Sequence, residues 1–331
     1  MKKLITTLLL LSFLLIISFS TQARTIEEIL VVGLSRTEEK VVRNQLPFRE
    51  GDEWKEEYRK WTLNRLSDMG IFSYQPQRII IEDISADKLR VIIRLADPSL
   101  FYIDPAEYAI SNLTMLPTKW FMQSIYNFSG NGEKIWFNIN WDNNYIYEVG
   151  GTIPIKKGLS SLNIESYRNE RKTYLEKGYL VETDYNYWYN SKVFQQFKLA
   201  YQKGDFNYDE QKIIIPTTSI FWQDTFSLGT IIQSGLNMTE DNKFIKTEGV
   251  FHKRNLPWNI LLRGGLLSNN TPDNHYYYLG GVGELPLRAE GYKKKAASYL
   301  LGSVEYHFEM KASLTPIVFA DGAVFKKDVD A

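Results

Sequence analysis

The chain has 331 residues, and its 39 basic and 39 acidic side chains give a formal net charge of zero. It contains no cysteine and 21 tyrosines. Charge neutrality without a basic stripe argues against nucleic-acid binding. The absence of thiols excludes disulfides and thiolate metal sites. A chain of this length suggests roughly two domains.

Residues 1–23 predict a secretory signal peptide. A basic start precedes an apolar run over residues 4–19, and Thr21 and Ala23 are the residues that a signal peptidase would read before cleavage after Ala23. A membrane anchor is the alternative, although the run is shorter than the roughly 20 apolar residues that span a bilayer. No later apolar run has spanning length, so the mature chain could enter a membrane only with strands.

Residues 24–98 predict a small α+β module. Periodicity and turn residues place its elements in the order β-α-α-β-β, with two strands after the second helix, over residues 26–32, 35–46, 54–70, 77–84 and 88–95. Ser35 and Glu38 have the spacing of a capping box at the start of the first helix. In the last strand Leu89, Val91 and Ile93 alternate with polar residues, which predicts one buried face.

Period-two alternation replaces the helical period from about residue 115 onward. In one segment Ile135, Phe137 and Ile139 face one side, while Trp136 and Asn138 face the other. Roughly twelve such segments, rich in Tyr, Phe and Trp, predict an antiparallel transmembrane β-barrel of about 12 strands over residues 99–331. A soluble β-sandwich or sheet would also alternate and stays open as an alternative.

The N-terminal module resembles a POTRA (polypeptide-transport-associated) domain. The resemblance rests on VVGLSRTEEKVVRNQLPFREGD at 31–52, on the L-x-x-M-G-I-F junction from Leu66 to Phe72, and on the strand that closes before Asp97-Pro98. Another small periplasmic α/β domain is the alternative. Either module would offer unpaired edge strands to which an extended client could add by β-augmentation.

The second part resembles the barrels of bacterial surface-antigen type that follow POTRA domains in outer-membrane assembly and translocation proteins. YNFSGNGEKIWFNINW resembles the N-x-x-G-x-G turn of the first hairpin of that family, with the motif at Asn127, Gly130 and Gly132. The resemblance implies a barrel in the bacterial outer membrane and a POTRA domain in the periplasm.

GGVGELPLRAEGY, at 280–292, is too long for a simple hairpin turn. Its end resembles the tip of a loop that enters the barrel lumen in that family, with two residues inserted between the arginine and the glycine of the tip. The strands that follow resemble the part of the barrel wall that the tip contacts. The resemblance implies tip residues Arg288, Gly291 and Tyr292, which would meet the wall residues Glu305, Phe319, Asp321 and Gly322. An Arg288–Asp321 pair would be strong because a guanidinium meets a carboxylate bidentately. A solvated loop arginine is the alternative, since Glu290 competes for it.

The sequence ends without the terminal aromatic strand of such barrels, so we expect either a C-terminally incomplete chain or a reduced barrel. Its three histidines lie on separate segments, and no catalytic motif is present, so we expect no enzyme activity, no metal and no cofactor. The resemblance implies a protein that inserts or assembles outer-membrane barrels or translocates polypeptides. Its partners would be unfolded outer-membrane or exported polypeptides, the lipid bilayer and periplasmic accessory proteins. A passive pore or surface antigen, and a secretion pore for one dedicated partner, remain alternatives.

Overall fold

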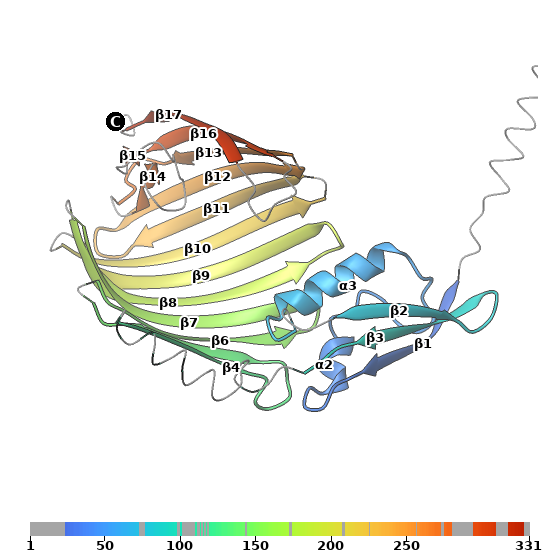
Figure 1. The fold of residues 1–331 in the computed structure, drawn as a ribbon. Helices are drawn as coiled ribbons and strands as arrows, with labels where there is room; N and C mark the ends of the chain where they lie inside the picture. The colour runs from blue at the N-terminus through green and yellow to red at the C-terminus, as the bar shows by residue number, and fades with distance from the viewer. Residues whose placement is uncertain are drawn as a thin grey trace, which may run out of the picture.

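The computed structural model describes residues 24–327, apart from 73–76, 98–99, 101–109, 111–112, 114, 116, 118, 143, 172–173, 207–208, 225, 256, 273–274, 280–293 and 309–316. Within these limits a small α+β module lies at one end of the strands of a large curved sheet (Figure 1). The predicted signal peptide and the predicted tip of the 280–292 loop fall outside the described residues.

The module has the predicted order of elements, which are β1 (Thr25–Val32), α2 (Glu39–Arg43), α3 (Glu57–Asp68), β2 (Arg78–Asp83) and β3 (Lys88–Arg94). Its sheet has the order β1-β3-β2, with β1 parallel and β2 antiparallel to β3. The predicted buried face of the last strand is confirmed, because Leu89, Val91 and Ile93 are fully buried. They pack with Leu66 of α3 into one core.

The start of the first helix differs from the prediction. The helix begins only at Glu39, and its N-cap residue Glu38 makes no side-chain capping bond. The Ser35 hydroxyl instead donates to Asp97 Oδ2 over 3.1 Å. A carboxylate that follows the last strand therefore replaces the expected local capping box, because it can accept several donors at once.

The second part is one twelve-stranded antiparallel sheet in the order β17-β16-β13-β12-β11-β10-β9-β8-β7-β6-β5-β4. Its strands are β4 (Trp120–Tyr126), β5 (Lys134–Asn140), β6 (Ile146–Ile155), β7 (Gly158–Arg171), β8 (Tyr174–Trp188), β9 (Val193–Phe206), β10 (Asp209–Gln223), β11 (Ser227–Asn237), β12 (Asn242–Asn255), β13 (Trp258–Leu267), β16 (Ser298–His307) and β17 (Ile317–Lys326). The predicted number of strands and their antiparallel order are confirmed.

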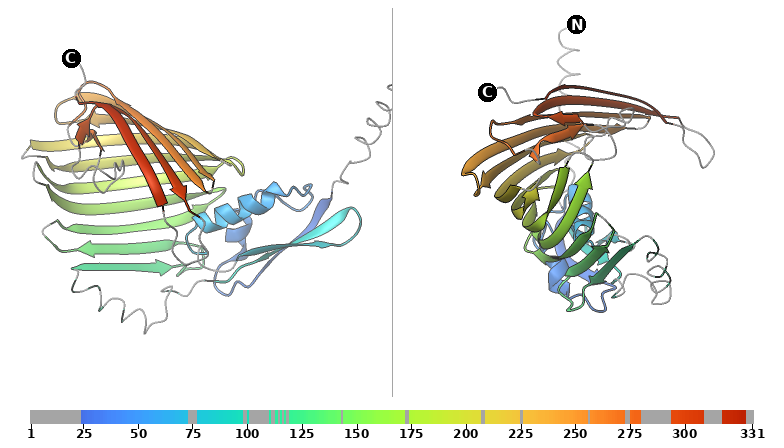
Figure 2. Two further views of the ribbon diagram at one scale, coloured as in Figure 1. Left: turned by 45° about the horizontal axis from the view of Figure 1, so that its top comes forward. Right: turned by 90° about the vertical axis from the view of Figure 1, so that its left-hand side faces the viewer.

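Closure into a barrel is not observed. Figure 2 shows the sheet curled but open, and among the described residues β4 and β17 are edge strands that do not pair with each other. Closure requires the first and last strands to exchange a ladder of backbone hydrogen bonds. The two edges also differ in length, at 7 and 10 residues.

A short hairpin interrupts the meander between β13 and β16. It consists of β14 (Tyr277–Leu279) and β15 (Lys294–Ala296), which pair antiparallel. Tyr277 and Leu279 are buried against Tyr299 and Leu301 of β16. The hairpin therefore covers part of the sheet on the side toward which these strand residues point.

Candidate functional site

The two faces of the large sheet have opposite chemistry. Strand registers place Leu162, Leu199 and Leu262 together on the outer face, and each residue is about half exposed, at 50%, 49% and 48%. On the inner face the same strands carry polar residues, such as Glu182 and Lys198, whose side chains form an ion pair. An apolar exterior around a polar interior is the reverse of a soluble sheet and suits a lipid surrounding.

A row of tyrosines marks one end of the outer face. Tyr185, Tyr187 and Tyr189 alternate along the end of β8 and its turn, and their ring centroids are 6.1 and 4.8 Å apart. Amphipathic rings gather at membrane–water interfaces because they offer an apolar body and a polar tip. The row lies at the end of the sheet that carries the α+β module.

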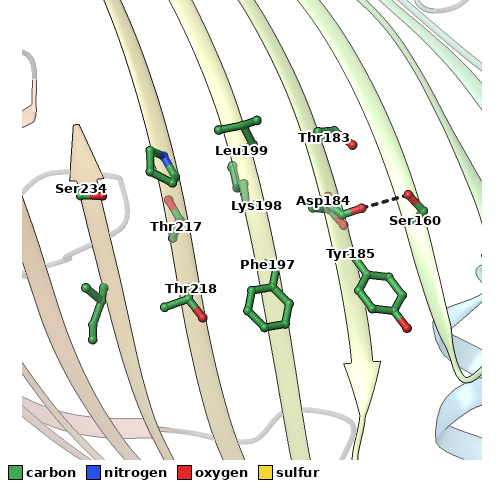
Figure 3. Close-up of a pocket in the computed structure, with 12 residues that line it drawn as sticks. Ser160, Thr183, Asp184, Tyr185, Phe197, Lys198, Leu199, Thr217, Thr218 and Ser234 are labelled. Carbon is green, nitrogen blue, oxygen red and sulfur yellow. Dashed lines mark hydrogen bonds between the residues drawn. The ribbon is translucent and has the colours of Figure 1, made fainter. Parts of the chain in front are cut away.

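A hollow of about 460 Å³ opens across the middle strands, lined by residues of β7 to β11 (Figure 3). Most of the lining belongs to the outer face, including Thr183, Phe197 and Thr218. The hollow coincides with a gap in the β10–β11 ladder, which pairs Ile214 and Thr217 in one register but skips the two residues between them. Pro216 lies in this gap, because proline has no N–H to donate to the ladder.

A network of hydrogen bonds and one ion pair lies on the inner face, next to the β14–β15 hairpin. Arg263 contacts Glu248 Oε1 through Nε at 2.6 Å and through Nη2 at 2.5 Å, while the Tyr299 hydroxyl donates to Glu248 Oε2 over 2.9 Å. The Tyr277 hydroxyl donates to the Thr247 carbonyl over 2.6 Å. This network fixes the base of the segment whose tip the sequence predicted to enter the lumen.

The predicted wall residues lie on β16 and β17. Glu305 is opposite Phe319, and Asp321 is opposite Ser303, so these side chains share the inner face. Gly322 lies opposite Gly302 on the outer face. The Glu305 carboxylate accepts one hydrogen bond from the Asn259 amide over 2.7 Å and contacts His307 Nε2 at 3.2 Å. Their predicted partners Arg288, Gly291 and Tyr292 lie outside the described residues.

The predicted first-hairpin turn connects β4 to β5 and meets the module. Asn127 is fully buried with φ of 49°. Its amide nitrogen donates to Thr37 Oγ1 over 2.6 Å, and its side-chain oxygen accepts the Gly132 N–H over 2.8 Å. Glu38 N–H donates to the Gly130 carbonyl over 2.9 Å. The turn is therefore built into the interface between the two parts of the chain.

Both glycines of this turn are required by space and by backbone conformation. Gly130 and Gly132 have φ of 89° and 79°, a region that suits glycine. A Cβ on Gly130 would lie 2.7 Å from the Arg36 carbonyl oxygen. A Cβ on Gly132 would lie 2.9 Å from Val41 of the module and 2.9 Å from Pro154 of β6. The motif found in the sequence thus serves close contact between module and sheet.

Asp97 holds the neighbouring loop of the module. Its carboxylate accepts backbone N–H bonds from Ser35, Arg36 and Thr37, and the Thr37 hydroxyl also donates to it. Burial by itself would raise the pKa of Asp97, but these donors stabilise the charged form and lower the pKa below its ordinary value. The same Thr37 receives Asn127, so Asp97 orders the surface on which the turn docks.

A second contact joins α3 to the β8–β9 turn. Arg65 is buried and donates to the Gln45 carbonyl over 2.8 Å and to the Trp188 carbonyl over 2.9 Å. Burial lowers the pKa of Arg65 to about 10. The Trp188 indole N–H donates in return to Asp68, whose pKa burial raises. Sequence reasoning missed this contact; an arginine within the apolar stripe of the second helix was the available signal.

A third contact reaches the β6–β7 turn. The buried Gln45 side chain donates to the carbonyls of Ile155 at 2.8 Å and Gly158 at 3.3 Å. The Lys157 N–H donates to the Asn44 carbonyl over 3.3 Å. Three successive turns of the sheet are thus bonded to the module, which fixes its orientation (Figure 1).

The described residues contain neither a helix that could span a membrane nor a cluster of metal ligands. No helix in that part of the chain is long and apolar enough to cross a membrane. The same residues contain no group of three or more His, Asp or Glu side chains placed to hold a metal ion.

A curled amphipathic antiparallel sheet with an α+β module bonded to the turns at one end defines the class of fold. Solved structures with this fold include BamA from Haemophilus ducreyi, lacking POTRA domains 1–3, which is 14% identical with a TM-score of 0.52 over 91% of this chain and 72% of that chain. CdiB from Acinetobacter baumannii is 12% identical with a TM-score of 0.58 over 92% of this chain and 64% of its own. CdiB from Escherichia coli is 9% identical with a TM-score of 0.60 over 94% of this chain and 67% of its own.

What these proteins share with this chain is the overall fold, over more than nine-tenths of this chain. The chain spans 64% to 72% of the length of these structures. No family model and no curated protein matches the sequence.

Proposed function

We propose that this chain is a bacterial outer-membrane protein that assembles β-barrel proteins into the membrane or moves polypeptides across it. The observation that carries the proposal is the amphipathic twelve-stranded sheet with open edges and a small module bonded to its turns. The fold shared with BamA and CdiB supports it. We assign the module to the POTRA class and place it in the periplasm.

The module would capture a client strand at β2. The outer edge of β1 is already used, because the Ile26 N–H donates to the Asp52 carbonyl and the Ile26 carbonyl accepts the Gly51 N–H. Arg43 also donates to the Ile29 carbonyl. On β2, the bond from Arg59 to the Ile79 carbonyl is the one hydrogen bond that the strand's backbone makes to described residues other than those of β3. An edge with unused N–H and C=O groups accepts an extended peptide by β-augmentation.

The edges of the large sheet would act on the same client in the membrane. β17 exposes apolar side chains along its length, including Val318 and Val324 at 61% and 77%. Unpaired backbone is costly in lipid, so an open edge favours pairing with another strand. The inserted loop would hold the lumen in its working state through an Arg288–Asp321 pair, with Glu305 beside it and Gly291 and Tyr292 shaping the tip.

The absence of cysteine makes a cross-linking test direct, because each introduced thiol is unique. Full-length protein in liposomes would receive a urea-unfolded barrel client that carries one cysteine. Glu82→Cys on β2 and Glu27→Cys on β1 form a matched pair, since both are exposed strand glutamates paired with basic neighbours. We expect disulfide adducts with Glu82→Cys and few with Glu27→Cys.

Activity is measured beside the adducts as protease-resistant client. The proposal expects faster client assembly than in empty liposomes and slower assembly when the β2 adduct is present. Arg288→Ala and Asp321→Ala should slow assembly to a similar degree, while wild-type rates in both would remove the role given to that pair. A steady ion conductance with no effect on clients would favour the passive pore. Adducts with one exported protein alone would favour a dedicated secretion pore.

A further inference from the structure

A polar cavity of about 360 Å³ lies where the module meets the β6–β7 turn. Arg43 and Arg49 line it from the module, and Lys156 and Lys157 line it from the turn of the sheet. Asp52 is the acidic residue in the lining. The cavity therefore joins two parts of the chain and carries a local excess of positive charge, although the whole chain is neutral.

The cations differ in how far they are already neutralised. Arg43 contacts Glu39 at 2.6 Å and Glu50 at 3.2 Å, so its charge is compensated. In the part of the chain that the structure describes, no carboxylate lies within ion-pair distance of Arg49, Lys156 or Lys157. Within the lining of the cavity, Arg49, Lys156 and Lys157 therefore outnumber the single carboxylate, that of Asp52. This carboxylate already accepts the Arg49 backbone N–H over 2.8 Å.

The cavity sits at the level where the apolar outer face ends. Ile153 and Ile155 point outward from β6 and are 48% and 41% exposed, and Lys156 follows directly. Tyr185, the first ring of the tyrosine row, lies against Gly158 on the other side of the turn. A change from exposed isoleucine to lysine beside a tyrosine row marks the membrane–water interface.

The walls of the cavity are held in place. Gln45 binds the carbonyls on both sides of the Lys156–Lys157 pair, and the Asn44 carbonyl accepts the Lys157 N–H. Lys157 has φ of 61°, which is the turn conformation that directs the chain back into β7. A preformed site of this kind loses little conformational entropy when a ligand binds.

We propose that this cavity binds the phosphate of an anionic phospholipid headgroup, with the acyl chains lying along Ile153 and Ile155. Lys156, Lys157 and Arg49 would contact the phosphate oxygens. Arginine and lysine at a membrane surface attract anionic lipids in this way. The proposal rests on the membrane location given above, and it adds a ligand that ties the module to the lipid surface.

The test uses full-length protein in an uncharged detergent and native mass spectrometry with dioleoyl phosphatidylglycerol. Dioleoylglycerol supplies the same tails without phosphate, and inorganic phosphate supplies the anion without tails. We expect the phospholipid to bind, and Lys156→Gln/Lys157→Gln to weaken that binding about tenfold. Arg49→Gln, on the other wall, should weaken it less, and it keeps the test valid if the turn variant fails to fold.

Lys243→Gln/Lys253→Gln is the matched control, because it removes two exposed lysines that do not line the cavity. It should bind the lipid as the wild type does. Wild-type lipid binding in both cavity variants would overturn the proposal. So would equal binding of dioleoylglycerol, or inorganic phosphate that binds as tightly as the lipid. Incorporation into liposomes is scored separately, so a failure of membrane location is distinguished from a failure of this site.

Discussion

The module buries its leucine and isoleucine side chains, whereas the large sheet exposes the same residue types on one face. In the module Ile26, Leu66 and Leu89 have no exposed surface, whereas Leu162 and Leu199 of the sheet are half exposed on its outer face. Both parts alternate apolar and polar residues along their strands, so alternation alone does not fix which side is buried. The surrounding solvent decides, because apolar groups leave water for a protein core but need not leave lipid.

The largest expected effect comes from a charge on the outer face. Leu199→Arg places a guanidinium toward lipid and should destabilise the sheet in liposomes by about 2–4 kcal/mol. Gln196→Arg, on the same strand but on the inner face, is the control and should cost less than about 1 kcal/mol. Urea titration in lipid, followed by tryptophan fluorescence, measures both. Equal effects would mean that the outer face does not meet lipid.

The next effect tests whether the module and the sheet behave as one unit. Arg65→Met leaves the carbonyls of Gln45 and Trp188 without their donor and should cost about 3 kcal/mol, since each buried unsatisfied group costs about 1–3. Lys60→Met on the exposed side of α3 is the control. Hydrogen exchange should rise in both α3 and the β8–β9 turn of the Arg65 variant. A rise confined to α3 would show that the contact does not couple the two parts.

A smaller effect is expected from a methyl group in the first-hairpin turn. Gly132→Ala and Gly51→Ala share a positive φ, but only the new Cβ at position 132 meets module and sheet atoms at about 3 Å. The difference between the two should be about 1–2 kcal/mol, the cost of overpacking a tight contact. Thermal unfolding of the full chain measures it. If the two variants lose the same stability, the turn does not press against the module.

The smallest effect concerns pH and involves Asp97, a carboxylate of the module. Because the folded pKa of Asp97 lies below its unfolded value of about 3.9, its stabilisation is present above that value and disappears as the pH falls through the folded pKa. Asp97→Asn should lower the free energy of unfolding by about 1 kcal/mol at pH 7, and the variant should then lose less stability than the wild type as the pH falls below about 4. An unchanged acid profile would show that Asp97 is not the group that titrates.

The site was predictable in part. The glycine motif identified the turn at Asn127, because positive φ restricts residue type locally, but nothing in the motif indicated that the turn docks on Thr37, 90 residues away. The Arg65–Trp188 contact spans 123 residues and has no local signature beyond a charge in an apolar stripe. The proposed pairing of Arg288 with Asp321 stays a prediction.

The sequence by itself determined the β-α-α-β-β order of the module, the number of strands in the sheet and the alternation of its faces. These follow from side-chain periodicity, which is set by neighbours along the chain. Tertiary structure decided that β4 and β17 do not pair among the described residues, that Asp97 replaces a capping box at Ser35, and that the turns of the sheet are bonded to the module. Such features depend on groups far apart in sequence, whose meeting is fixed only when the whole chain has packed.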